Sequence, residues 1–423
     1  MLHLKHFVAA VIVAIVLIPL HSFAQVSGCT DSQANNFNPD ADSNDGSCTY
    51  DLTLTKPKLK YVLPQEIEET SGLAFFNGGL WTLNDSGGEP VIYKLDSATG
   101  EVIQRIRLKN ATNVDWEDMT LDGQYVFIGD FGNNSGNRKD LKVYKIKRSD
   151  IPAEGDAEVV AEKIEFFYPD QPNKKIERRK YNNYDCEAMI SFGDSLYLFS
   201  KNWENYRTRV YSLPKEPGSY AANLLDSYNV AGLITAADYD PQDQEIVLIG
   251  YTNKTWVPFA WLLFDFHDAD FFSGNKRRID MPYIMTTQTE GYTYVEGKHG
   301  VISSEKTKLG PQSAYEFNTG KWTGEEASVM IEKSSGSDFD FSISPNPVKS
   351  SKVRLKLENM PVGEYKIRLY DHSGRLLNIK KHVLKRKEDK VFIQLKTHKL
   401  APGTYTIVLS NRNKKVAKNF IKE

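Results

Sequence analysis

The chain has 423 residues, of which 40% are hydrophobic, 26% charged and 12% aromatic, with three cysteines. This profile excludes a disordered or fibrous protein and a disulfide-dense miniature fold. The formal net charge of −2 hides an asymmetry, because residues 339–423 carry 20 Lys and Arg against 7 Asp and Glu, and the remainder carries −15. So acidic a body argues against nucleic acid as a partner.

Residues 1–24 have the pattern of a secretory signal peptide. Lys5 supplies the positive charge, residues 7–20 form the apolar stretch, and small residues stand at both positions before a cleavage site. The apolar stretch is shorter than the ~20 residues that a membrane span needs, so we expect no transmembrane span in the mature chain. A lipobox-like Val-Ser-Gly-Cys ends at Cys29, but polar residues separate it from the apolar stretch.

Residues 25–50 form an acidic segment bracketed by Cys29 and Cys48. In an oxidising compartment, a disulfide between these two cysteines would close a short loop and contribute ~3 kcal/mol. Short oxygen-bearing side chains inside the loop suit a hard cation such as Ca²⁺, and the candidate ligands are Asp40, Asp42, Asn44 and Asp45. The segment resembles thrombospondin type 3 units, which implies calcium binding. The alternative is a solvated acidic turn that the disulfide holds together.

Residues 51–333 contain short strands rich in Val, Ile, Tyr and Phe, bounded by Gly, Asn and Asp. One unit of three strands recurs five times, and each unit begins with a small or acidic pair of residues. The intervals between these pairs are 46, 70, 50 and 53 residues. Strand-only repeats at such a period are typical of propeller blades.

We therefore predict an all-β chain, in which a five- or six-bladed β-propeller is followed by a small antiparallel β-sandwich. The interval of 70 residues implies either an insertion around residues 151–180 or part of a sixth blade. Residues 51–63 are expected to supply a strand that closes the ring. A long β-sandwich is the alternative fold for residues 51–333.

The first two repeats carry the sharpest motifs, at residues 69–74, 80–87, 115–118 and 128–134. With these motifs the body resembles an uncharacterised family of secreted bacterial β-propeller proteins. The resemblance implies the propeller fold and leaves the activity open.

A linker rich in Ser and Gly is expected at residues 334–338, followed by a separate domain at residues 339–423. This domain has a Ser-Pro-Asn-Pro opening, alternating strands joined by Gly turns, and a Lys-rich final strand. It resembles the type A sorting domain of the type IX secretion system. The resemblance implies a Bacteroidetes-type bacterium, the type IX machinery as partner, and a secreted or outer-membrane surface location after Sec export. The alternative is an ordinary C-terminal sandwich that binds a ligand.

The start of each innermost strand and the end of each second strand should meet around the propeller axis. Among the residues at the strand starts, Ser71, Ala237 and Asp238 are therefore expected near the axis, together with several acidic residues. The candidate ligand-binding residues are Asn84, Asp85, Glu117, Asp118, Asp130, Asn133, Glu187, Lys201, Glu290 and Glu305.

Glu117, Glu187 and Glu290 fall at the same position of their repeats. Three carboxylates around one axis repel one another unless they share a proton or a cation, which points to a central Ca²⁺. The alternative is structural: acids at blade starts accept hydrogen bonds from backbone N–H groups and staple neighbouring blades.

The most consistent function is a secreted or cell-surface module that binds a glycan, peptide or small ligand. The alternative is a metal-dependent hydrolase, phosphoesterase or lactonase-like, in which a cation polarises an oxygen and a carboxylate acts as general base. A structural adhesin that uses the Cys-bracketed segment is a third hypothesis.

Overall fold

The computed structural model describes residues 25–284, 287–323, 340–360, 362–370, 376–384, 388–398, 400–410 and 415–423. The expected signal peptide and the expected linker at residues 334–338 lie outside these residues. In the part of the chain that is described, no helix is long and apolar enough to cross a membrane.

The Cys-bracketed segment contains two short parallel strands, β1 (Ser27–Gly28) and β2 (Ser43–Asn44). The predicted disulfide between Cys29 and Cys48 is present. The segment lies against the propeller, because Asn44 Nδ2 donates to Asn275 Oδ1 at 3.1 Å and Arg277 Nη1 donates to Gln33 Oε1 at 2.7 Å. These bonds attach the N-terminal segment to one particular blade.

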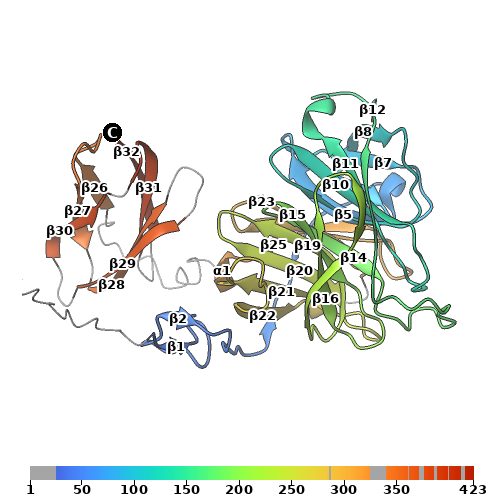
Figure 1. Cartoon of the computed structure of the whole chain (residues 1–423), viewed down its shortest axis with the longest axis horizontal. Helices are drawn as coiled ribbons and strands as arrows, with labels where there is room; N and C mark the ends of the chain where they lie inside the picture. The colour runs from blue at the N-terminus through green and yellow to red at the C-terminus, as the bar shows by residue number, and fades with distance from the viewer. Residues whose placement is uncertain are drawn as a thin grey trace, which may run out of the picture.

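Five sheets form the body, and we number them as blades in chain order (Figure 1). Blade 1 contains β5 (Thr70–Phe76), β6 (Gly79–Asn84), β7 (Val91–Leu95), β8 (Val102–Leu108) and β12 (Ala157–Val159). Blade 2 contains β9 (Trp116–Leu121), β10 (Tyr125–Asp130), β11 (Leu141–Lys147), β13 (Glu162–Phe167) and β17 (Gly218–Ala221). Blade 3 contains β14 (Cys186–Phe192), β15 (Ser195–Ser200), β16 (Thr208–Pro214) and β18 (Asn223–Tyr228).

The last two blades include strands from the start of the body. Blade 4 contains β19 (Leu233–Asp240), β20 (Glu245–Tyr251), β21 (Pro258–Phe264), β22 (Asn275–Asp280) and β3 (Thr53–Leu54). Blade 5 contains β23 (Thr289–Glu296), β24 (His299–Ser304), β25 (Ser313–Asn318) and β4 (Lys58–Val62). Single turns of helix occur between strands at η1 (Gln65–Ile67), η2 (Arg148–Asp150) and η3 (Pro282–Ile284), and α1 (Gly320–Thr323) follows the last strand of blade 5.

The innermost strands β5, β9, β14, β19 and β23 contact one another in that order, and β23 contacts β5, so the ring is closed. Among the described residues the propeller therefore has five blades. The segment expected as an insertion or a sixth blade adds only outer strands: β12 pairs with β8, and β13 pairs with β11. The expected closure by residues 51–63 is confirmed, because β4 forms the outer strand of blade 5.

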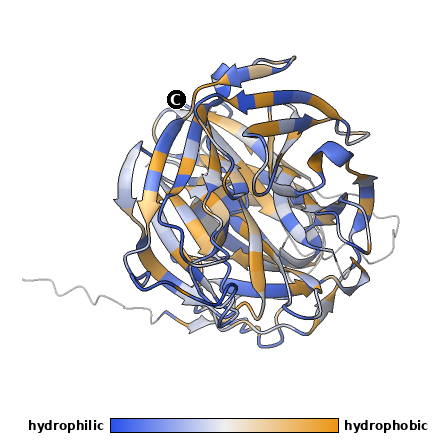
Figure 2. Cartoon of the chain, turned by 90° about the vertical axis from the view of Figure 1, so that its right-hand side faces the viewer, coloured by the Kyte–Doolittle hydropathy of each residue, from blue (hydrophilic) through white to orange (hydrophobic). Residues whose placement is uncertain are grey.

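A separate apolar core fills each of the five interfaces between neighbouring blades. The second strands β6 and β20 are buried on both faces and so contain nearly continuous apolar residues rather than strict alternation. Figure 2 shows apolar residues along the strands and hydrophilic residues frequent in the loops and outer strands. The apolar cores lie between the blades. An ionisable side chain that is buried near the axis therefore needs a hydrogen bond, an opposite charge or a proton to compensate its burial.

The C-terminal domain is an antiparallel sandwich with its own core. One sheet contains β26 (Asp340–Ser344), β27 (Lys352–Met360) and β30 (Glu388–Lys396). The other contains β29 (Leu376–Leu384), β28 (Gly363–Tyr370), β31 (Gly403–Ser410) and β32 (Lys415–Lys422). The buried residues of this core all come from residues 341–420, so no propeller side chain in the described part of the chain completes it.

Candidate functional site

The mouth of the propeller is the end of the ring where the innermost strands begin and the second strands end. Each innermost strand has a bulge close to its start, where its pairing with the second strand shifts. A bulge inserts an unpaired residue and re-aims its side chain away from the regular alternation of the strand. The unpaired residues are Ser71 with Gly72, Glu117, Glu187, Thr235 and Glu290.

The bulges explain why three glutamates occur at one register. The sequence repeat assigned Ala237 to this position in blade 4, and that assignment is wrong, because Thr235 is the bulged residue there. Ser71 Oγ donates to the backbone oxygen of Glu117, and Thr235 Oγ1 donates to that of Thr289 at 2.5 Å. The two hydroxyl groups therefore join adjacent blades.

Asp118 and Asp238 act as staples between blades. Asp118 Oδ2 accepts hydrogen bonds from the N–H groups of Met189 at 2.7 Å and Ala237 at 3.4 Å, so one carboxylate joins blades 2, 3 and 4. Asp238 Oδ2 accepts from Tyr294 N–H at 2.9 Å, across the next interface. Burial raises the pKa of Asp238 to about 6 despite these bonds. The structural alternative raised for blade-start acids thus describes these two residues.

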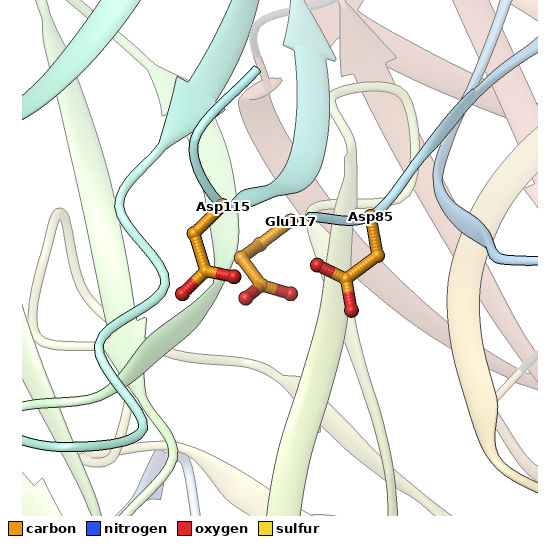
Figure 3. Close-up of side chains that lie close together, drawn as sticks. All are labelled: Asp85, Asp115 and Glu117. Carbon is orange, nitrogen blue, oxygen red and sulfur yellow. The ribbon is translucent and has the colours of Figure 1, made fainter. Parts of the chain in front are cut away.

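Asp85, Asp115 and Glu117 form the acidic cluster of the mouth (Figure 3). One carboxylate oxygen from each of the three side chains lies within 4.8 Å of those of the other two. Asp85 follows β6, Asp115 precedes β9, and Glu117 is the bulged residue of β9. The Asn113 side chain holds the two segments together, since its Nδ2 donates to Asp85 O at 2.7 Å. Glu117 is buried, whereas Asp85 and Asp115 are half-buried, so the cluster is open on one side.

The electrostatic environment of the acidic cluster favours protonation or a bound cation. Burial, followed by repulsion from Asp85 and Asp185, raises the pKa of Asp115 to about 7. Burial raises the pKa of Asp85 to about 6. Burial and the neighbouring carboxylates hold the pKa of Glu117 well above its usual range. Three carboxylates this close cannot all be ionised at neutral pH without compensating positive charge.

Glu187 is placed differently, because it forms a buried ion pair with Lys201. The Lys201 ammonium also lies over the rings of Trp203 and Tyr251, at 5.2 and 5.3 Å from their centroids. Burial disfavours the charge on Lys201, but Glu187 and Glu290 outweigh it and raise the pKa of the lysine. The trio of Glu117, Glu187 and Glu290 is therefore not one cation-sized cluster: Glu187 already has a cationic partner.

Glu290 and Glu305 lie beside this ion pair. Glu290 is 4% exposed, and its Oε2 has no hydrogen-bond partner among the residues that the structure describes. Burial, opposed by Lys201 and reinforced by Asp85, raises the pKa of Glu290 to about 7. Burial and the charge of Glu290 raise the pKa of Glu305 to about 9, and Gln288 Nε2 donates to Glu305 Oε2. Both carboxyl groups thus extend the acidic mouth toward blade 5.

The other predicted mouth residues brace loops. Asp130 is fully buried, and Arg138 Nη2 donates to its Oδ1 at 2.8 Å. Asn133 Nδ2 donates to Tyr184 O at 3.1 Å, and Asn84 Nδ2 donates to Glu66 O at 2.9 Å. These bonds hold the loops that surround the acidic cluster.

Sequence reasoning did not single out Asp115 or Asp185 as site residues. Asp185 is buried and accepts from Trp203 Nε1 at 2.7 Å, so it positions the ring beside Lys201. The signal was present as a repeated Asp-x-Glu pattern, at residues 115–117 and 185–187. The pattern places an aspartate one residue before each of these innermost strands.

The predicted calcium ligands of the N-terminal segment are engaged locally. Asn44 Oδ1 accepts from Gly46 N–H, and Asp45 Oδ1 accepts from Ser47 N–H, each at 3.0 Å. Within residues 25–50 no three Asp, Glu, His or Cys side chains converge closely enough to share an ion. Calcium binding by Asp40, Asp42, Asn44 and Asp45 stays a prediction.

Comparison with known proteins identifies the C-terminal domain. Residues 342–423 match the family described as "Secretion system C-terminal sorting domain", which confirms the resemblance seen in the sequence. The protein is therefore exported by type IX secretion to the cell surface or the extracellular space. No curated protein matches the chain.

Two solved structures are among those with a similarity to this chain. An exo-β-1,3-galactanase from Phanerochaete chrysosporium with galactose is 9% identical at a TM-score of 0.41, over 86% of this chain and 98% of that chain. A putative 6-phosphogluconolactonase from Bacteroides uniformis is 12% identical at a TM-score of 0.29, over 80% of this chain and 89% of that chain. Scores this low support no conclusion about activity, and the assignment of the fold rests on the sheet topology.

Proposed function

We propose that this protein is a cell-surface or secreted binding propeller whose acidic cluster holds a divalent cation, most simply Ca²⁺. The cation presents free coordination positions to an oxygen-rich ligand such as a glycan, a peptide or a small acid. The observation that carries the proposal is the convergence of Asp85, Asp115 and Glu117 at the mouth, with one carboxylate oxygen of each within 4.8 Å of the others.

Three further features of the mouth support a cation. Ca²⁺ takes six to eight oxygen ligands, so three carboxylates leave positions for water or for ligand hydroxyl and carboxylate oxygens. The raised pKa values of Asp85 and Asp115 mean that bound positive charge would replace protons that the site otherwise takes up. Glu290 is a fourth carboxyl group near the site: its Oε2 has no hydrogen-bond partner among the described residues, and burial together with the charge of Asp85 raises its pKa.

Calorimetric titration of the chelator-treated mature chain with CaCl₂ tests this proposal. We expect one strong site that Asp115→Asn removes and Asp42→Asn leaves intact, because Asp42 belongs to the N-terminal segment. Glu316→Gln, an exposed carboxylate of β25, serves as a second matched control. Loss of the site in Asp42→Asn with retention in Asp115→Asn would assign the cation to the N-terminal loop and refute the proposal for the mouth.

A metal-dependent hydrolase is the second candidate function, and one observation favours it. The pKa values of Asp115 and Glu290 are each raised to about 7, which is the range in which a carboxylate works as a general base at neutral pH. A cation would polarise a phosphoryl or ester oxygen while one carboxylate takes a proton from water. Hydrolysis of 4-nitrophenyl phosphate and of a γ-lactone should then depend on Ca²⁺ and disappear in Glu290→Gln. Calcium binding without turnover would leave the binding function.

A further inference from the structure

A hollow lies at the seam where blades 5 and 1 meet, at the end of the propeller opposite to the mouth. Because β5 and β23 both begin at the mouth, their last residues and the following turns lie at this opposite end. The hollow has a volume of about 550 Å³. We call it the seam pocket. Its size falls within the range of ~300–1,000 Å³ that is usual for small-molecule sites.

The walls of the seam pocket are apolar and aromatic. They include Tyr61 of β4, Phe75 of β5, Val295 of β23, Phe317 of β25 and Trp322 of α1. Most of these side chains are held by the core between blades 5 and 1 or by that between blades 4 and 5. The walls are therefore preformed, and a ligand would gain contact area without ordering them first.

The rim of the seam pocket is positively charged, in contrast to the acidic body. Lys56, Lys58, Lys60 and Lys321 line it, and Glu316 is the single carboxylate among the described residues of the lining. Glu316 is paired with Lys58 at 3.2 Å. Among the described residues, the other three lysines form no ion pair. This leaves a local excess of positive charge on a body that is otherwise strongly negative.

Lys321 shows how the charge and the apolar wall are combined. Its Nζ donates to Thr55 Oγ1 at 2.9 Å and lies 4.0 Å from the centroid of the Trp322 ring. Partial burial disfavours the ammonium charge and so lowers the pKa of Lys321. An anionic group beside this ammonium would relieve that cost, and an aromatic body would lie on the adjacent apolar wall.

We propose that the seam pocket binds a small amphipathic anion, in which an aromatic body contacts Tyr61, Phe75 and Phe317 and one acidic group is held by Lys321 and Lys60. The site is independent of the cation at the mouth. It thus gives the propeller a second binding function on its other face.

Calorimetric titration of the mature chain with 2-naphthalenesulfonate tests the seam pocket, with 2-naphthylmethanol as a neutral molecule of the same ring. We expect the sulfonate to bind with one site per chain and at least ten times more tightly than the alcohol. Its affinity should fall as salt is raised, because charge contributes to binding. Lys321→Gln and Lys60→Gln should each weaken the sulfonate at least fivefold. Lys139→Gln, an exposed lysine of blade 2, should not.

A steric variant separates this pocket from any other apolar surface. Ser97 lies in the exposed turn after β7 and lines the pocket, so Ser97→Trp should reduce sulfonate binding without disturbing the fold. Equal affinity for the sulfonate and the alcohol would overturn the proposal. So would unchanged binding in Lys321→Gln and Ser97→Trp, or the absence of binding at millimolar sulfonate. Calcium binding at the mouth is expected to be unaffected in all of these variants, which keeps the two tests distinct.

Discussion

Replacing Asp115 by Asn should weaken the loss of stability that the propeller shows as pH rises, because Asp115 lies in the acidic cluster. The pKa of Asp115 is raised from 3.8 to about 7 in the folded chain, so the folded state holds a proton that the unfolded state releases. The free energy of unfolding therefore falls as pH rises from about 4 to about 7, and the full penalty is present above pH 7. Asp115→Asn carries no proton to lose and removes this penalty.

The size of the effect follows from the shift. Three pKa units correspond to about 4 kcal/mol, and the partial exposure of Asp115 reduces this to an expected gain of about 2 kcal/mol. In chelator at pH 8, Asp115→Asn should thus be more stable than the wild type by about that amount, and near pH 4 the two should be equal. Saturating calcium should reverse the order, since it adds about 2.7 kcal/mol to the wild type at a hundredfold excess over Kd.

Urea unfolding followed by tryptophan fluorescence measures this directly. All six tryptophans lie between residues 81 and 322, so the signal reports on the propeller and not on the sorting domain. Midpoints would be recorded from pH 4.5 to 8.5 in chelator and in calcium. A destabilised Asp115→Asn at pH 8 in chelator, or a difference that does not vary with pH, would refute the reasoning.

Three other changes should have distinct outcomes. Lys201→Met leaves the buried Glu187 without its partner and should cost about 3–5 kcal/mol of unfolding free energy, most of which the double variant with Glu187→Gln should recover; equal losses in both would contradict a coupled pair. In Gly132→Ala the new methyl group would meet the carboxylates of Glu117 and Asp115, so calcium affinity should fall at least tenfold while the far-ultraviolet spectrum is unchanged; normal affinity would place the cation elsewhere. A chain that ends at residue 338 should keep a cooperative thermal transition, because the sandwich core takes no residue from the propeller; loss of the transition would make the tail part of the body.

The propeller architecture was largely predictable, because each repeat has the same order of short apolar strands separated by turn residues. The ring has five blades because β12 and β13 complete blades 1 and 2, whereas the long interval between repeats left a sixth blade open. Such parallel or late strand pairings join segments that are distant in sequence, and no local pattern specifies their partners.

The candidate site was harder to predict, because bulges decide which neighbouring residue faces the axis. Glu117 and Asp118 are adjacent acids, yet the bulge sends Glu117 to the acidic cluster and leaves Asp118 to staple three blades. One shift in strand pairing assigns Glu117 to the acidic cluster and Asp118 to the contacts between blades. The amino-acid composition of the strand does not indicate where such a shift occurs. The ion pair of Glu187 depends on Lys201 at the end of the neighbouring strand, which the sequence placed at the mouth without assigning it a partner.

The most direct test of the central claim is X-ray diffraction from crystals of the mature chain grown with Tb³⁺, a strongly anomalous substitute for Ca²⁺. The account predicts one anomalous peak within coordination distance of Asp85, Asp115 and Glu117, with the remaining ligands supplied by water. An anomalous peak confined to residues 29–48 would contradict the account. So would the absence of a peak at the mouth, with the three carboxyl groups hydrogen-bonded to one another.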